Sequence, residues 1–221
     1  MTFSICVRTE SPDGTVYGTA VATDAPAVGA LAPYTSVHGA VSTQAFVNVR
    51  LGRRGIALLD DVPLEQALSG VLERDEHAAL RQLHGVGSDA VFGHTGEETE
   101  EWSGHETYPG EGVTVAGNML TGPETLRAVS EAFTEGEATD AVDAGTVPRL
   151  IDSLAAGVEA GGDKRGHSSA AVVVSAPQTT AYHDLRVDHH DEPVDELRRV
   201  YEAAYGASDG FSEASKERIF D

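Results

Sequence analysis

The apolar segments of this 221-residue chain come in adjacent pairs joined by short turns, and this pairing restricts its fold more than any other feature. Residues 3–8 and 15–23 are rich in β-branched and aromatic side chains, with the turn-forming segment 11–14 (SPDG) between them. They predict a β-hairpin at the start of the chain. Residues 83–86 and 90–92 predict a second hairpin of the same kind.

Helical segments are grouped between these strand pairs instead of following each strand. Apolar residues recur at helical spacing in residues 63–80, 123–133, 147–160 and 193–205. Further strands are expected at residues 37–43, 113–116, 168–175 and 185–187. The polar, acidic residues 94–111 predict a surface loop. This order favours an α+β sandwich, in which helices are layered on antiparallel sheets, over a doubly wound parallel sheet.

Acidic residues outnumber basic ones by 36 to 15, which gives a formal net charge of -21. Such a chain would be repelled by a phosphate backbone, so nucleic acid is not an expected partner. Lys164 and Lys216 are the only lysines among the basic residues. We interpret this composition as the surface of a halophilic protein, on which concentrated salt screens the repulsion between carboxylates. An acidic protein of a mesophile is the alternative interpretation.

We expect a cytoplasmic protein that has no membrane partner. No apolar run reaches the roughly 20 residues of a membrane helix, and residues 1–10 lack the basic and apolar regions of a secretory signal. The single cysteine, Cys6, excludes an intramolecular disulfide and a cysteine-rich zinc site. The length predicts a single domain at residues 1–205, followed by a polar tail at residues 206–221.

Thr2 is the first candidate for chemistry, because removal of Met1 would leave this threonine with a free α-amine. Such a residue holds a nucleophile and a base together: an α-amine with a pKa of about 7.7 to 8.0 accepts the hydroxyl proton. Strand alternation places Thr2, Ser4 and Cys6 on one face of the first strand. The alternative is an ordinary processed N-terminus.

Nine short blocks of the sequence together resemble a known family. They are residues 2–5 (TFSI), 18–22 (GTAVA), 27–29 (AVG), 39–45 (GAVSTQA), 52–55 (GRRG), 117–120 (GNML), 161–166 (GGDKRG), 169–170 (SA) and 184–188 (DLRVD). Over residues 2–205 the chain resembles the domain-of-unknown-function 1028 family. The resemblance implies an N-terminal nucleophile (Ntn) hydrolase-like fold, a four-layer αββα sandwich of two antiparallel sheets covered by helices. By analogy, a homodimer is also expected.

Within this template, polar residues at strand ends are candidates for supporting Thr2. Asp24 follows the second strand and suits orientation of the amine or hydroxyl, with a turn cap as its alternative role. Ser42 and Gln44 end the third strand and are candidates for binding substrate, with local backbone hydrogen bonding as the alternative. Asn118 beside a glycine suits an oxyanion hole or, equally, a turn.

Asp163 and Arg165 lie in a glycine-rich loop and form a candidate clamp for a substrate carboxylate, because arginine binds carboxylates through two parallel hydrogen bonds. The alternative is a structural ion pair that positions Ser168, which is a further catalytic candidate.

His189 and His190, between two aspartates, raise the possibility of a metal-dependent hydrolase. Adjacent histidines point in different directions, however, and the i, i+4 pair of a zinc-binding helix is missing from the sequence. We therefore expect no metal and no cofactor. Cys6, at an interior strand position, is expected to be a small buried hydrophobe instead of a reactive thiol.

Two function hypotheses remain. The first is an Ntn-type hydrolase that cleaves a C–N amide bond of a small metabolite. Thr2 attacks, its own amine takes the proton, and Asn118 or backbone N–H groups hold the oxyanion. The second is a non-catalytic module of the same fold that binds a ligand or assembles with partners, since a fold does not fix a function.

Overall fold

The computed structural model describes residues 2–162 and 166–209 and contains two antiparallel sheets. The larger sheet has six strands in the order β10-β9-β2-β1-β8-β7. Their bounds are β1 Thr2–Ser11, β2 Gly14–Thr23, β7 Gly104–Tyr108, β8 Val113–Asn118, β9 Ser169–Ser175 and β10 Asp184–Val187. The smaller sheet has the order β3-β4-β5-β6. Its strands are β3 Pro33–Ser36, β4 Gly39–Ala45, β5 Arg81–Gly87 and β6 Val91–Thr95.

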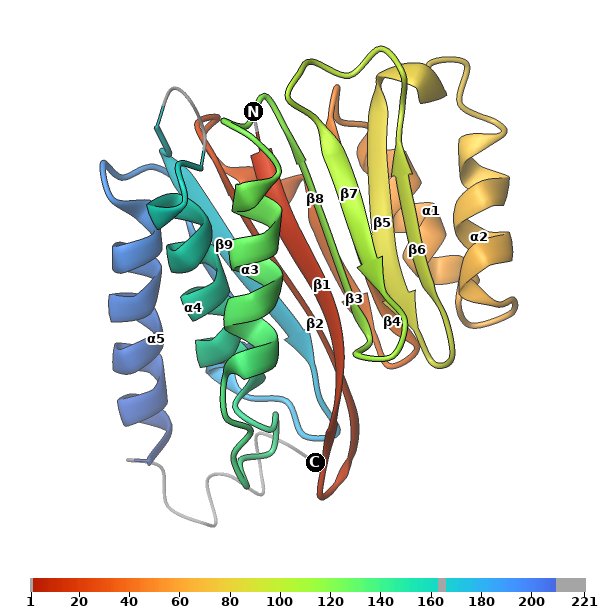
Figure 1. Cartoon of the computed structure of the whole chain (residues 1–221). Helices are drawn as coiled ribbons and strands as arrows, with labels where there is room; N and C mark the ends of the chain where they lie inside the picture. The colour runs from red at the N-terminus through yellow and green to blue at the C-terminus, as the bar shows by residue number, and fades with distance from the viewer. Residues whose placement is uncertain (1, 163–165, 210–221) are drawn as a thin grey trace.

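Five α-helices in the described part of the chain cover the outer faces of the two sheets (Figure 1). They are α1 Val49–Leu58, α2 Leu64–Leu72, α3 Glu124–Glu135, α4 Thr146–Glu159 and α5 Pro193–Asp209. Helices α3, α4 and α5 pack on the six-stranded sheet, and α1 and α2 pack on the four-stranded sheet. The predicted α+β sandwich is confirmed. None of the helices described has the length and apolar character needed to cross a membrane.

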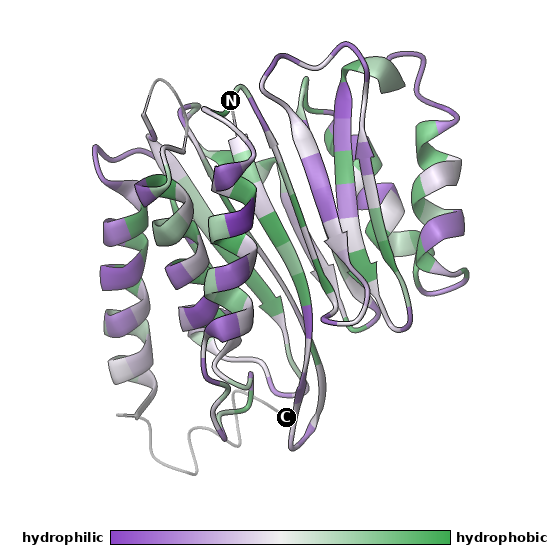
Figure 2. Ribbon diagram, viewed as in Figure 1, coloured by the Kyte–Doolittle hydropathy of each residue, from purple (hydrophilic) through white to green (hydrophobic). Residues whose placement is uncertain are grey.

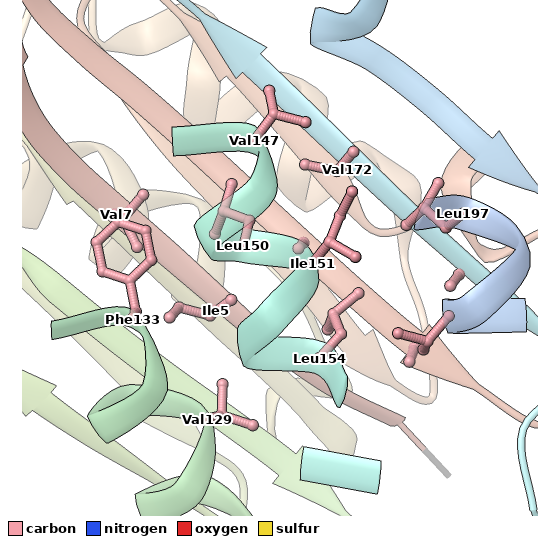
Figure 3. Close-up of a cluster of buried hydrophobic side chains, with 14 of the residues drawn as sticks. Ile5, Val7, Val129, Phe133, Val147, Leu150, Ile151, Leu154, Val172 and Leu197 are labelled. Atoms are coloured by element: carbon pink, nitrogen blue, oxygen red, sulfur yellow. The ribbon is translucent and has the colours of Figure 1, made fainter. Parts of the chain in front are cut away.

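The main hydrophobic core lies between the six-stranded sheet and its helices (Figure 3). Phe3, Ile5 and Val7 point into it from β1, as strand alternation requires. Leu150 and Leu154 meet them from α4. The helix approaches closely because Gly157 has no side chain: a Cβ there would lie 2.6 Å from the Phe3 ring.

A second apolar core fills the space between the four-stranded sheet and helices α1 and α2. Val41 and Leu83 contribute to it from β4 and β5. Figure 2 shows hydrophilic bands alternating with hydrophobic ones along β5, so the other face of this strand is polar. That polar face turns toward the six-stranded sheet and forms the layer described below.

The predicted hairpins are confirmed, since β1 pairs with β2 and β5 pairs with β6. Besides strand β3, which was not predicted, three other predictions were wrong or incomplete. The helix expected at residues 63–80 ends at Leu72, because the Asp75 carboxylate accepts the His77 N–H at 3.0 Å and forms a turn there. The expected loop at residues 94–111 contains β7, an edge strand whose alternate residues face solvent and are polar.

The third difference is helix α1, which the sequence patterns missed. It contains Gly52 and Gly55, and glycine lowers helix propensity by about 1 kcal/mol. Gly52 is nevertheless required, because a side chain there would collide with the Tyr34 ring. At the other end of the chain, α5 extends to Asp209, and residues 210–221 lie outside the described part. The division between a domain ending at residue 205 and a tail stays a prediction.

Candidate functional site

Between the two sheets lies a layer of buried polar side chains, in contrast to the apolar cores beneath the helices. We call it the inter-sheet layer. Its members are Thr2, Ser4, Cys6, Thr19, Thr23, Ser42, Gln44, Gln82, His84, Thr114 and Asn118. Buried polar groups are normally hydrogen-bonded, and a connected network of them specifies one arrangement of the surrounding elements.

Ser4, at the centre of this layer, joins the two sheets. Its Oγ donates to Gln44 Oε1 at 2.6 Å and lies 2.7 Å from His84 Nε2. A hydroxyl has one proton, so His84 Nε2 carries the proton of the second bond and donates it to Ser4. His84 Nδ1 then accepts from the Thr114 hydroxyl at 2.8 Å.

The protonation of His84 determines what this pair can do. Burial, with a smaller contribution from nearby His105, lowers the pKa of His84 from 6.5 to about 3, so the ring is neutral near pH 7. A neutral histidine that donates to Ser4 does not serve as its base. Ser4 is also fully buried, at 0% exposure. The Ser4–His84 pair is therefore a structural link between the sheets.

The network continues from Gln44 toward the N-terminal end of β1. Gln44 Nε2 and Asn118 Nδ2 both donate to Gln82 Oε1, at 3.0 and 2.9 Å. Gln82 Nε2 donates in turn to the Gly117 carbonyl at 2.7 Å. Gln82 thus fixes the orientation of the Asn118 amide. Among the described residues the second proton of Asn118 Nδ2 has no acceptor, which leaves a donor for a ligand.

Thr2 lies at the edge of the inter-sheet layer. It pairs in register with Thr23 on one side and Asn118 on the other. Its Oγ1 lies 3.0 Å from Thr23 Oγ1. At 9% exposure Thr2 is more accessible than Ser4, so it is the hydroxyl group of β1 nearest to solvent at this end.

Three backbone conformations at this end of the sandwich are unfavourable for residues with a side chain. Ala27 follows β2 by a few residues, Ala45 ends β4, and Met119 follows β8, and their φ angles are 60°, 70° and 58°. The left-handed region costs a non-glycine residue roughly 1–2 kcal/mol. Such strain clusters at functional sites, which supports this end of the sandwich as the candidate site.

Asp24 and Ser168 lie close to Thr23, and backbone groups take part in the hydrogen bonds between these segments. Ser168 N–H donates to the Thr23 carbonyl at 2.8 Å, and the Ser168 hydroxyl donates to the Asp24 carbonyl. These two bonds attach the segment before β9 to the end of β2. The structure thus gives Ser168 a positioning role beside Thr23, and its predicted catalytic role stays a prediction.

The four predicted substrate-binding residues have different outcomes. Gln44 belongs to the network described above. Ser42 is fully buried on the same face of β4, paired in register with His84, and its Oγ has no hydrogen-bond partner among the described residues. Asp163 and Arg165 lie outside the described residues.

Thr23, Gln82 and His84 belong to the site but were missed by the sequence predictions. Gln82 and His84 stand two residues apart in a strand, so they share a face. The sequence signal for Gln82 and His84 was the alternation of polar and apolar residues in a strand that a sandwich must bury. It was not decisive because the same pattern is typical of a strand with one face in water.

Cys6 is buried, whereas the histidine pair lies at the surface. Burial raises the pKa of the Cys6 thiol to about 12, against smaller opposing hydrogen bonds, so the thiol is protonated and unreactive near pH 7. His189 and His190 are exposed. His190 Nδ1 accepts the Glu192 N–H at 3.0 Å, just before α5 begins. In the described ranges, no group of three or more histidine, cysteine or carboxylate residues suits a metal ion.

The fold and the site define an α+β sandwich protein with a hydrogen-bonded polar layer between its two sheets. A family model described as "Family of unknown function (DUF1028)" matches residues 2–197, and the chain belongs to this family. The chain is also similar to protein SPO2555 from Silicibacter pomeroyi, whose crystal structure is assigned to the same family model. The two share 29% identity with a TM-score of 0.80, over 92% of this chain and 85% of the other. A search of curated proteins found no match.

Proposed function

We propose that the protein is an N-terminal nucleophile hydrolase that cleaves a C–N amide bond of a small metabolite. Thr2, exposed by removal of Met1, would be the nucleophile. The observation that carries the proposal is the position of Thr2, at the edge of the inter-sheet layer beside Thr23 and Asn118. The sandwich architecture is consistent with it, and so is the Ntn hydrolase-like fold that the family resemblance implies.

The proposed reaction begins with attack of Thr2 Oγ1 on the carbonyl carbon of the amide. The α-amine of Thr2 takes the hydroxyl proton as the new C–O bond forms. The carbonyl oxygen becomes an oxyanion, and the second Nδ2 proton of Asn118 donates to it. The protonated amine then gives its proton to the departing nitrogen, and the C–N bond breaks. Water hydrolyses the resulting ester and restores Thr2.

Gln82 has a supporting role in this proposal. An oxyanion hole works because its donors are already oriented before charge develops, so no reorganisation is needed during the reaction. The bond from Asn118 Nδ2 to Gln82 Oε1 supplies that orientation. Thr23 has a comparable role, since its Oγ1 holds the Thr2 side chain in one rotamer.

A second candidate, a ligand-binding module without turnover, is favoured by the packing around Thr2. The Thr2 side chain is only 9% exposed, and its Oγ1 already has a hydrogen-bond partner. The same position can therefore serve as a closed structural end of the sheet.

The two candidates are separated by labelling with a hydroxyl-directed electrophile such as a β-lactone. Intact mass spectrometry of the purified protein is first expected to show loss of Met1. Peptide mapping after treatment is then expected to place one acyl group on Thr2, retained in Thr2→Ser and lost in Thr2→Ala.

Thr107→Ala is the matched control, because Thr107 is an exposed threonine on edge strand β7 and lies outside the inter-sheet layer. It is expected to be labelled as the native protein is. Retention of Met1, or equal labelling of native protein and Thr2→Ala, would refute the hydrolase and leave the binding module.

A further inference from the structure

A cavity of about 1000 Å³ lies between helices α1 and α2, apart from the inter-sheet layer. Arg81 lines it from β5, whereas its neighbour Gln82 points into the inter-sheet layer. Since successive side chains of a strand face opposite ways, the cavity lies on the helical side of the four-stranded sheet. A site here is independent of Thr2 and of the proposed hydrolase.

One end of this cavity is a rigid hydrogen-bonded assembly. Arg81 Nε and Nη2 donate to the two carboxylate oxygens of Asp75, at 3.0 and 3.3 Å, and both side chains are 6% exposed. Asn48 Nδ2 donates to Asp75 Oδ2 at 2.9 Å. Burial alone would raise the pKa of Asp75, but hydrogen bonds led by Arg81 lower it to about 2. The pair is thus charged, internally balanced and fixed in place.

Three further arginines that line the cavity are not balanced in this way. Arg50, Arg54 and Arg74 are exposed, and their side chains make no hydrogen bond or salt bridge with the residues that the structure describes. Three cations without protein partners therefore face one cavity.

The positive charges on helix α1 are also unfavourable while no anion is bound. Arg50 stands in the first turn, where the helix dipole disfavours a cation, and the first turn has no acidic residue. Arg50 and Arg54 are four residues apart, so their like charges repel each other. A bound anion would relieve both effects. Sequences that depart from the local rules of helix design do so mainly at functional sites.

We propose that the α1–α2 cavity binds a small organic anion. Its acidic group would pair with Arg50, Arg54 and Arg74, and its apolar body would rest on Leu58 and Val62. Glu73 and Glu76 flank Arg74 in the same wall and would repel an extended polyanion. The site is therefore suited to a metabolite with one acidic end and a hydrophobic body.

The fluorescent probe 8-anilinonaphthalene-1-sulfonate has this chemistry and tests the proposal on the full-length folded protein. We expect saturable binding with one probe per chain, competed by inorganic phosphate more strongly than by chloride at equal ionic strength. The double variant Arg50→Gln/Arg54→Gln is expected to raise the Kd roughly tenfold or more, because each substitution removes a charge-assisted contact. Arg74→Gln should act in the same direction.

Arg127→Gln is the matched control, since Arg127 is an exposed arginine on α3, on the opposite side of the sandwich. It removes one positive charge, as Arg74→Gln does, and is expected to leave the Kd unchanged. Circular dichroism confirms that every variant is folded at the salt concentration used. The proposal is overturned if the folded native protein shows no saturable binding. It is equally overturned if the double variant binds as Arg127→Gln does.

Discussion

The hydrogen bonds of Gln82 provide a quantitative test of how much the inter-sheet layer stabilises the fold. Gln82→Leu keeps nearly the same volume but removes every polar bond of the side chain. Three buried partners are then orphaned, namely Gln44 Nε2, Asn118 Nδ2 and the Gly117 carbonyl. An orphaned buried polar group costs about 1–3 kcal/mol, and burial of the leucine side chain returns roughly 1.5–3 kcal/mol.

The expected net loss is about 4 kcal/mol of the free energy of unfolding, a large part of the ~5–15 kcal/mol typical of a domain. For a chain of this length, each kcal/mol shifts the Tm by about 2–4 °C, so we expect a fall of roughly 8–16 °C. Thermal unfolding followed by circular dichroism measures it.

Gln66→Leu is the control, because Gln66 is exposed on α2 and the same substitution there orphans no buried group. It is expected to change stability by less than about 0.5 kcal/mol. If Gln82→Leu falls within about 1 kcal/mol of this control, the bonds of the layer contribute little and our account of it is wrong.

Three further predictions concern titration, reactivity and salt. The pKa of His84 is about 3 in the folded state against 6.5 for the free residue, so its contribution is present above pH 6.5 and is lost as the pH falls toward 3. Between pH 6.5 and 3, each unit of falling pH should lower the free energy of unfolding by about 1.4 kcal/mol more in the native protein than in His84→Gln. Urea unfolding at several pH values measures this, and equal dependence on pH in the two proteins would contradict the burial of a neutral ring. Cys6, with a pKa of about 12, should resist a disulfide reagent at pH 8 in the folded protein and react once the protein is unfolded; rapid reaction of the native protein would show that the thiol is accessible. The net charge of -21 predicts that stability rises with KCl up to molar concentrations; a Tm independent of KCl would end the halophilic interpretation.

Much of the architecture was predictable from the sequence because its signals are local. The turn at residues 11–14 and the apolar stripes of α3 and α4 lie within single segments, and both were found close to their observed bounds. Edge strand β7 was missed because it is partly solvated, so its residues resemble those of a loop. Helix α1 was missed because Gly52 and Gly55 allow close contacts with Tyr34 of β3 and Leu68 of α2 that only the folded structure creates.

The candidate site was less predictable for a related reason. Thr2, Gln44 and Asn118 were found because each stands at a strand end with a recognisable chemical group. Gln82 and His84 were missed, because their role depends on which of two sheet faces is buried against the other sheet. The distance between Gln82 and Asn118 in the sequence carries no information about the bond of 2.9 Å that joins their side chains across the two sheets. Pairing across sheets is a tertiary property.

The central place of the first hairpin has a consequence for biosynthesis. Strand β1 needs β8 as its outer neighbour, and β2 needs β9, so both edges of the hairpin stay open until residues 113–118 and 169–175 have been made. Translation adds roughly 5–20 residues per second, so β9 is made on the order of ten seconds after the hairpin. During that time the nascent chain exposes two strand edges that are able to pair with other chains.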